Sequence, residues 1–437
     1  MVSLSINFYD RRPEVMKKLL LSASIMWIVF ATAQSLPPTY SFRELQGISF
    51  QSLGLKTGDA GKIASVEWRP SRNEFLVAVG KSNVLKDLFV YQVGSDAPII
   101  SKIADVKTSK GFTIQAAAWS PMGNYIAVAG VTKKGATIIK LFHYNIADPS
   151  GKPLRFVRQL KASGKNGTFN GISWQFEEQY LLVSGKGLLF SGMGQAAEMA
   201  LFSFNKWSGE LSYSYSVDEN IGAQSSYVMV PQSNLIVQIP PTGMGDTRIL
   251  NFDTGSLVLD KGLTLAQLPA QTTATVFKAL LKDSVVVGAV LGGKALSDGN
   301  QLQLYSFDED FEPHATIAPN NGSAFATDAS VGRVDKIATP QNINTAEPLD
   351  QGLLAVGGLV NSQQLGLRLF RFLADKKKFI STSATKILAA ASGSAVLSSV
   401  AQVSHVAVNV DGTFVLALGK NSPNESDISV YQLLEAI

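Results

Sequence analysis

Apolar residues in this chain come in short runs that alternate with polar residues or continue unbroken, with Gly, Pro, Asn and Asp between them. The clearest stretch contains four such runs, at residues 114–120, 125–130, 138–146 and 154–161. Runs of this length, bounded by turn-forming residues, predict β-strands. We therefore expect four consecutive antiparallel strands here. Two later segments, 344–356 and 384–401, leave the choice between helix and strand open because glycine and β-branched residues interrupt their helical pattern.

The third run of this stretch contains a four-residue pattern, apolar-any-any-aromatic, that recurs along the chain. It occurs seven times, as LFVY, LFHY, LFSF, ILNF, LYSF, LFRF and ISVY, ending at Tyr91, Tyr144, Phe204, Phe252, Phe307, Phe372 and Tyr431. The interval from Tyr91 to Tyr431 is 340 residues, or about 57 per repeat, and a second anchor spans the same distance from Trp68 to Val408. Two anchors that advance together indicate a genuine internal repeat of seven units.

A four-stranded antiparallel unit of this length is typical of one blade of a β-propeller. The segments "WSPMGNYIAVAG" with "LFHYNIADPSGKPL", and "NVDGTFVLALG" with "ISVYQLL", resemble divergent WD-repeat blades. The resemblance covers roughly residues 40–434 and implies a rigid interaction platform without catalysis. The Gly-His and Trp-Asp dipeptides of that family are missing from every unit. We therefore expect packing, rather than the family's polar network, to hold the blades together.

The seventh unit ends the chain after three predicted strands, whereas residues 40–52 precede the first unit and belong to no complete blade. The economical solution is that the N-terminal strand completes the last blade and pairs its open edge. The predicted fold is therefore an all-β, seven-bladed propeller of four-stranded antiparallel blades, closed by that strand. The alternative for residues 40–52 is a flexible leader.

The N-terminal region has the three parts of a secretory signal peptide. Lys17 and Lys18 precede an apolar run at 19–30, and Ala31–Ala33 forms a small-x-small cleavage site before Gln34. Residues 1–33 are therefore predicted to be removed, with translation starting at Met16 as one possibility, and residues 34–437 to form a single secreted or periplasmic domain. The alternative is an uncleaved anchor, and no other stretch approaches transmembrane length.

Composition limits the chemistry further. The formal net charge is +4, and +2 without residues 1–33, which gives no support to nucleic-acid binding. Absence of cysteine excludes disulfides and thiolate metal sites, and His143, His314 and His405 fall in different units. Glycine clusters at 184–195 and 240–247 lead into strands, so we interpret them as tight turns rather than phosphate loops. We expect no metal and no cofactor.

The variable segments between the second and third strands of each unit share one propeller face with the connectors between blades, and such a face usually binds partners. Nine lysines in the first three units are candidates for binding an acidic partner there: Lys81, Lys86, Lys107, Lys110, Lys133, Lys134, Lys161, Lys165 and Lys186. Acidic residues occupy the corresponding loops of later units: Asp218, Glu219, Asp246, Asp298, Glu425 and Asp427. The alternative is that these lysines are scattered solubilising charges.

These observations favour a non-catalytic secreted scaffold that binds a protein or polymer partner through its loops. The alternative is a propeller enzyme, of hydrolase, lyase or lactonase type, with carboxylates around the central channel. Convergence of several ionisable side chains at the channel mouth would favour the enzyme.

Overall fold

The computed structural model describes residues 40–218, the strands of the segment 225–408, and residues 409–435, except for short gaps at 57–61, 71, 82, 95–98, 166, 176, 410–411 and 423–424. The predicted signal peptide lies outside the described residues. Thr39–Ala436 form one compact unit. In the part of the chain that is described, no helix has the length and apolar character needed to cross a bilayer.

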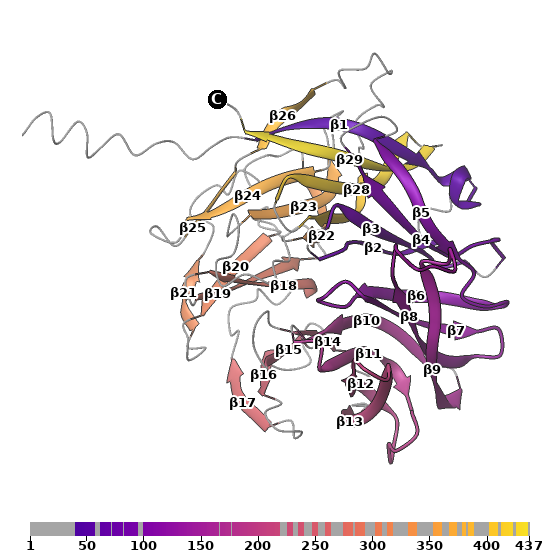
Figure 1. The fold of residues 1–437 in the computed structure, drawn as a ribbon. Helices are drawn as coiled ribbons and strands as arrows, with labels where there is room; N and C mark the ends of the chain where they lie inside the picture. Colours follow the sequence, from indigo (N-terminus) through magenta and orange to yellow (C-terminus); the bar gives the residue numbers. More distant parts are fainter. Residues whose placement is uncertain are drawn as a thin grey trace, which may run out of the picture. The chain divides into compact units, whose positions relative to one another are not determined.

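Five four-stranded antiparallel sheets follow one another along the chain (Figure 1). The first three sheets comprise β2 (Ile63–Trp68), β3 (Glu74–Val79), β4 (Leu88–Val93) and β5 (Ile100–Val106); β6 (Phe112–Trp119), β7 (Tyr125–Thr132), β8 (Ala136–Tyr144) and β9 (Leu154–Lys165); and β10 (Thr168–Trp174), β11 (Tyr180–Leu188), β12 (Ala197–Asn205) and β13 (Glu210–Asp218). The next two comprise β14 (Ser226–Met229), β15 (Leu235–Ile239), β16 (Thr247–Asn251) and β17 (Val258–Leu263), then β18 (Ala274–Lys282), β19 (Val285–Gly292), β20 (Leu302–Phe307) and β21 (Pro313–Ile317).

The remaining strands form a nine-stranded sheet that contains two runs of the same kind. The strands of this sheet are β22 (Val331–Ala338), β23 (Leu353–Val360), β24 (Leu367–Leu373) and β25 (Lys378–Ser381), then β27 (Gln402–Val408), β28 (Phe414–Ser422), β29 (Glu425–Glu435) and β1 (Tyr40–Ser49), with β26 (Ser383–Leu388) parallel to β1. One residue pair, Leu359 with Gln402, joins the two runs. The two segments left open between helix and strand thus contribute to β23 and β26.

Consecutive up-and-down sheets of four strands are the architecture of a β-propeller. The predicted all-β propeller is therefore confirmed, and the four runs predicted at 114–161 correspond to β6–β9 within a few residues. The first strand of each sheet contacts the first strand of the next, as β2 does with β6 and β6 does with β10. Successive sheets therefore pack face against face.

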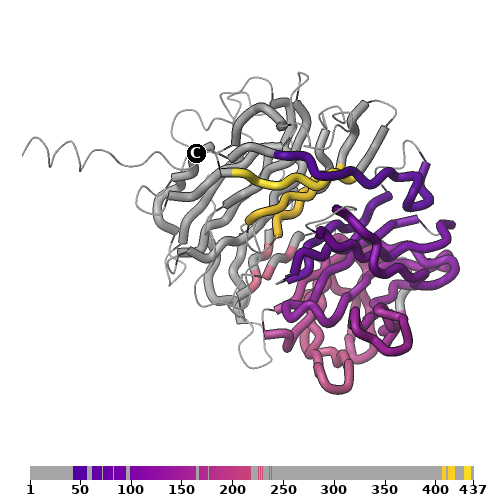
Figure 2. The backbone as a smooth tube through the Cα atoms, turned by 45° about the horizontal axis from the view of Figure 1, so that its top comes forward, coloured from indigo at the N-terminus to yellow at the C-terminus, as the bar shows by residue number. Residues whose placement is uncertain are grey.

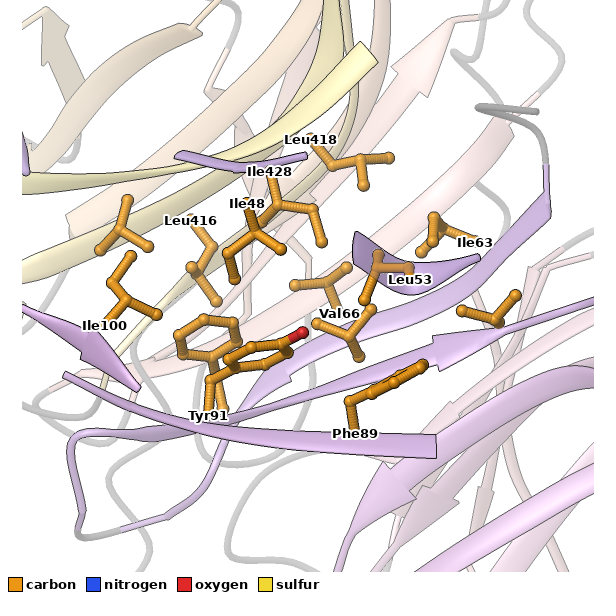
Figure 3. Close-up of a cluster of buried hydrophobic side chains, with 14 of the residues drawn as sticks. Ile48, Leu53, Ile63, Val66, Phe89, Tyr91, Ile100, Leu416, Leu418 and Ile428 are labelled. Atoms are coloured by element: carbon orange, nitrogen blue, oxygen red, sulfur yellow. The ribbon is translucent and has the colours of Figure 1, made fainter. Parts of the chain in front are cut away.

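The N-terminal strand β1 lies antiparallel to β29, from Tyr40 opposite Glu435 to Ser49 opposite Asp427 (Figure 2). Ile48 of β1 is buried with Leu416, Leu418 and Ile428, in a cluster that also includes Val66 and Tyr91 of the first sheet (Figure 3). The indole nitrogen of Trp68 in β2 donates to the carbonyl of Ala407 in β27 at 3.1 Å. The two ends of the described chain are therefore joined by backbone pairing and by a shared apolar core.

A glycine recurs near the end of the second strand of a sheet, and this recurrence has a steric cause. A Cβ atom on Gly130 of β7 would collide with the carbonyl oxygen of Thr113, and one on Gly185 of β11 with that of Thr168. These oxygens belong to the neighbouring first strands, β6 and β10. Glycine at this point lets the first two strands of each sheet approach closely.

The first strands have an edge that no strand of their own sheet covers, and polar side chains of the preceding sheet supply acceptors there. Ser65 Oγ accepts from the backbone N–H of Ala117 at 2.9 Å, and Gln115 Oε1 accepts from that of Phe169 at 3.0 Å. Glu67 Oε2 accepts from the N–H of Trp119 at 3.2 Å. Backbone donors that would otherwise lie unpaired at an edge therefore link successive sheets.

The expectation that packing alone holds the sheets together is wrong in part, because buried polar groups also bridge them. Arg69 pairs with Glu74 at 2.8 Å and donates from Nε to the carbonyl of Gly123 in the next sheet, also at 2.8 Å. Glu198 of β12 is buried and accepts from Tyr227 and Gln238 of the fourth sheet. These contacts differ from the WD-repeat dipeptides, so the sequence comparison did not find them.

Replacing Ile48 by alanine is expected to lower the free energy of unfolding by about 2–5 kcal/mol, because a buried isoleucine leaves a cavity between β1 and the sheets on either side. Urea unfolding of the purified chain measures this change. Ile146→Ala is the matched control, since Ile146 is 49% exposed and its truncation should cost well under that amount. Equal losses in the two variants would show that β1 does not contribute to the core.

Candidate interaction surface

The lysine-bearing loops of the first two sheets lie at the same end of those sheets. Leu88, which begins β4, is opposite Val106, which ends β5. Phe112, which begins β6, is opposite Thr132, which ends β7. The β3–β4 loop (80–87), the connector between sheets (107–111) and the β7–β8 turn (133–135) are therefore on one face, as predicted.

Three of the nine candidate lysines are in strands rather than in loops. Lys161 and Lys165 belong to β9, and Lys186 belongs to β11. Their placement in loops is wrong. Lys161 lies within the run predicted as a strand at 154–161, and Lys165 lies in β9 because that strand continues through 162–165, where small and polar residues gave no apolar signal. Lys186 lies in β11 because that strand continues to Leu188. The variable segment predicted at 131–137 is also shorter than expected, because β7 continues to Thr132 and β8 begins at Ala136.

Two of the loop lysines are already paired with carboxylates of this chain. Lys86 Nζ lies 2.9 Å from Asp105, and Lys107 Nζ lies 2.9 Å from Asp87. Lys102 also contacts Asp105, at 2.7 Å. Burial alone would raise the pKa of Asp105, but hydrogen bonds from Lys102 and Lys86 outweigh it and hold that pKa below its ordinary value. The positive charges of Lys86 and Lys107 are therefore partly neutralised within the chain, which makes these two lysines weaker candidates for binding an acidic partner.

Asp87 is the centre of a buried polar cluster that sequence reasoning missed. Its carboxylate is fully buried and accepts from the backbone N–H of Thr108 at 2.7 Å, the Thr108 hydroxyl at 2.8 Å and Lys107. Lys140 of β8 reaches the same connector from the other side. Its Nζ donates to the carbonyl of Thr108 at 2.8 Å and to Ser109 Oγ at 2.7 Å.

Lys140 is a charged group in an unusually apolar place. Its side chain is 4% exposed, and Nζ lies 4.7 Å from the centre of the Phe112 ring. Burial lowers the pKa of Lys140, Asp87 opposes this effect and Lys107 adds to it. The sequence holds one sign of this cluster, namely that both charged residues occupy the same place in the repeat: Asp87 directly precedes LFVY and Lys140 directly precedes LFHY.

The connector and the β7–β8 turn are held together. The backbone N–H of Lys133 donates to the carbonyl of Gly111 at 2.9 Å, and the aliphatic part of Lys133 packs against Gly111. Lys110 and Lys134 are therefore brought close to Lys133. We call the boundary between two successive sheets a seam. At the seam between the second and third sheets, the N–H of Ser163 in β9 donates to the carbonyl of Leu189, which follows β11.

Five of the nine lysines take part in none of the ion pairs found among the described residues: Lys110, Lys133, Lys134, Lys161 and Lys186. We call these five residues the basic surface. Acidic side chains were predicted in the corresponding loops of later units, and these lie outside the described part of the structure: Asp218, Glu219, Asp246, Asp298, Glu425 and Asp427.

The histidines give no metal centre in the described region. His143 of β8 is half-buried beside the Tyr125 ring, and burial, together with Arg155, lowers the pKa of His143 against the effect of Asp148. His314 lies in β21, whose backbone pairs with β20 at Ser306. The side chain of His405 in β27 is outside the described ones. No group of three or more acidic, histidine or cysteine residues suited to a metal occurs in the part that is described.

Comparisons with known proteins agree with this fold. Residues 40–143 match the family of eukaryotic translation initiation factor eIF2A, and this match takes in β1 to β8 without the rest of the chain. A search of curated proteins gives no match.

Among solved structures, the chain is similar to Raptor from Chaetomium thermophilum, with a TM-score of 0.56 and 11% identity over 91% of this chain and 29% of that one. A chain of the mitotic checkpoint complex gives 0.52 and 11% identity, over 87% and 94% of the two chains. A candidate 6-phosphogluconolactonase from Bacteroides fragilis gives 0.52 and 10% identity, over 84% and 91%. At such identities these likenesses concern the fold alone.

The ion pairs of Asp105 are expected to make stability depend on pH. Because the folded pKa lies below the unfolded value of 3.8, the contribution of Asp105 is present above that value and is lost as the pH falls through the folded pKa. The Asp105→Asn variant should therefore be less stable than the parent at pH 7, and the gap should shrink well below pH 4.

Urea unfolding at the two pH values measures this gap, and carboxyl NMR measures the pKa directly. In Lys86→Met/Lys102→Met, burial acts alone and the pKa of Asp105 should rise. Lys110→Met/Lys134→Met is the control and should leave the pKa of Asp105 unchanged. An Asp105 pKa that stays unchanged in Lys86→Met/Lys102→Met would contradict the assignment.

Proposed function

We propose that this chain is a non-catalytic interaction platform: a seven-bladed propeller that is closed by β1 and binds an acidic protein partner through the basic surface. The observation that carries the proposal is the gathering of Lys110, Lys133 and Lys134 on the connector 107–111 and the β7–β8 turn, which are bonded to each other. None of these three lysines forms an ion pair with another residue that the structure describes. The export of the chain to the cell exterior or periplasm is part of the same proposal.

Seven blades and closure are supported by topology. Five sheets have four strands each, and the nine-stranded sheet divides into β22–β25 and a second run of β27, β28, β29 and β1. β2 contacts both β6 and β27, so its sheet has a neighbour on each side. Closure by the N-terminal strand would leave no sheet with an unpacked face.

The electrostatics of the basic surface favour steering rather than tight individual contacts. An exposed lysine pair contributes about 0–1 kcal/mol, so no single lysine would dominate binding. Several like charges on one face raise the association rate of an acidic partner through long-range attraction. We therefore expect the charge of the basic surface to act mainly on the association rate.

The comparisons bear on this proposal through the names of the similar proteins. The mitotic checkpoint complex is by its name an assembly, which fits a propeller used for binding. The initiation-factor match suggests a second setting, translation, whereas residues 1–33 favour export. The lactonase neighbour keeps the catalytic alternative open. In β2, β6 and β10, the first strands of the first three sheets, Glu67 is the one acidic or basic residue, so these three strands offer no cluster of ionisable groups for an active site.

The triple variant Lys110→Glu/Lys133→Glu/Lys134→Glu tests the binding face. An immobilised parent chain is used to capture proteins from the native envelope fraction, and the association rate of each captured partner is then measured. Charge reversal should lower that rate by about tenfold or more at low salt. The effect should fade as the screening length falls from about 10 Å at 0.1 M to about 3 Å at 1 M salt.

Lys152→Glu is the control for a charge reversal on an exposed turn of the same sheet, and it should have little effect. A rate that responds neither to the triple variant nor to salt would return these lysines to the role of solubilising charges. Binding would then have to be sought on other loops.

Export is tested separately, by N-terminal sequencing of the protein recovered from its native source. Cleavage by a signal peptidase should leave Gln34 as the first residue, because Ala31–Ala33 supplies the small-x-small site. A mature protein that retains Lys17 and Lys18 would contradict the proposed soluble exported form, whatever the result for the binding face.

A further inference from the structure

The connector 107–111 between the first two sheets carries Lys110, yet it is held from both sides by buried charged groups. Asp87 lies directly before β4, the third strand of the first sheet, and Lys140 lies in β8, the third strand of the second sheet. Each residue directly precedes the aromatic motif of its unit, so the two occupy equivalent positions in successive repeats. Equivalent positions with opposite charges thus converge on a single stretch of backbone.

The bonds of this cluster account for the polar groups at the centre of the connector. The carboxylate of Asp87 accepts hydrogen bonds from the backbone N–H of Thr108 at 2.7 Å and from the Thr108 hydroxyl at 2.8 Å. Lys140 supplies donors to the carbonyl of Thr108 and the hydroxyl of Ser109. Thr108 is therefore bonded through its N–H, its carbonyl and its side chain, which is a strong restraint on a loop residue.

Holding a loop in this way is costly, which suggests that the arrangement has a use. Burying a carboxylate and an ammonium group carries a desolvation penalty that apolar residues would avoid. The third unit has Ala200 at the equivalent position, and its buried charge lies two residues earlier, at Glu198, which accepts from the backbone N–H of Ser225 in the following connector at 3.3 Å. A buried charge bonded to a connector therefore recurs although its position and its sign change. Stability alone therefore gives a poor account of Asp87 and Lys140, whereas an ordered connector gives a better one.

The restraint passes on to the basic surface. Gly111 at the end of the connector accepts from the N–H of Lys133, so the β7–β8 turn is registered against the connector. The backbone that carries Lys110, Lys133 and Lys134 is consequently fixed in position. Rigid presentation reduces the entropy lost on binding and favours a partner whose carboxylates are themselves fixed in space.

We infer that Asp87 and Lys140 are positioning residues that fix the connector, so that the basic surface recognises a folded acidic protein surface rather than a flexible polyanion. This inference rests on the proposed function for its binding step. A flexible polyanion would respond to the number of charges, whereas a folded partner would also respond to their arrangement.

The restraint itself is tested by hydrogen exchange, without any partner. Lys140→Met keeps the length of the side chain and removes both of its bonds to the connector, and it should fold because it also removes a buried charge. Amides at 108–111 should exchange about tenfold faster in Lys140→Met and in Asp87→Ala than in the parent. Lys152→Met, the same substitution on an exposed turn, should leave them unchanged. Unchanged exchange in both connector variants would overturn the inference.

The binding step uses two defined probes: poly-L-glutamate, and a small three-helix domain with an acidic face, selected from a library on the parent chain and counter-selected on the triple glutamate variant. For the helical domain, Lys140→Met should raise the dissociation rate about tenfold with little change in association rate. Poly-L-glutamate should bind Lys140→Met and the parent within about twofold of each other, because the exposed charges are the same. Equal losses for both probes, or no loss for the helical domain, would overturn the inference.

Failure of the proposed function would give results that differ from those that overturn this inference. If no library member binds the parent after counter-selection on the triple variant, or if the triple variant binds poly-L-glutamate as well as the parent does, the basic surface is not a binding face. The hydrogen-exchange result would then still decide whether Asp87 and Lys140 fix the connector.

Discussion

Each sheet of this chain has to be covered on both faces, and the rest of the structure depends on that constraint. In β3 all six residues, Glu74–Val79, are buried, which a sheet with one face in water could not achieve. A sheet of four strands this apolar is stable only between two neighbours. The pairing of β1 with β29, the bonds between first strands and the buried ion pairs all follow from keeping neighbours in contact.

Polar groups at the seams have two roles: some pair with backbone donors at strand edges, and others join turns, connectors and strands through buried side chains. Ser65, Glu67 and Gln115 accept from backbone donors of the next sheet and so remove the disadvantage of an exposed strand edge. Arg69, Asp87 and Glu198 are buried side chains that join turns, connectors and strands across a seam. A divergent repeat can therefore lose the dipeptides of the WD family and still keep polar contacts between its sheets.

The sequence was sufficient for those features that depend on local patterning. Alternating apolar runs and turn residues predicted β6–β9 closely, and the recurring aromatic motif indicated the repeat. Sequence patterning could not reveal which lysines are paired, because Lys107 and Asp87 are 20 residues apart and Lys140 and Thr108 are 32 apart. It also missed the end of β9, since backbone pairing with β8 extends that strand through residues without an apolar pattern.

The pairing of β1 with β29 has a consequence for how this chain folds. Residues of β1 find their partners almost 400 positions later, as Tyr40 does with Glu435. Contacts so distant in sequence form slowly, because a large loop must close before the pairing stabilises it. The early sheets can form as soon as their own strands are present, but β1 must wait for the end of the chain. During that interval the unpaired edge of β1 is open to incorrect pairing with another chain.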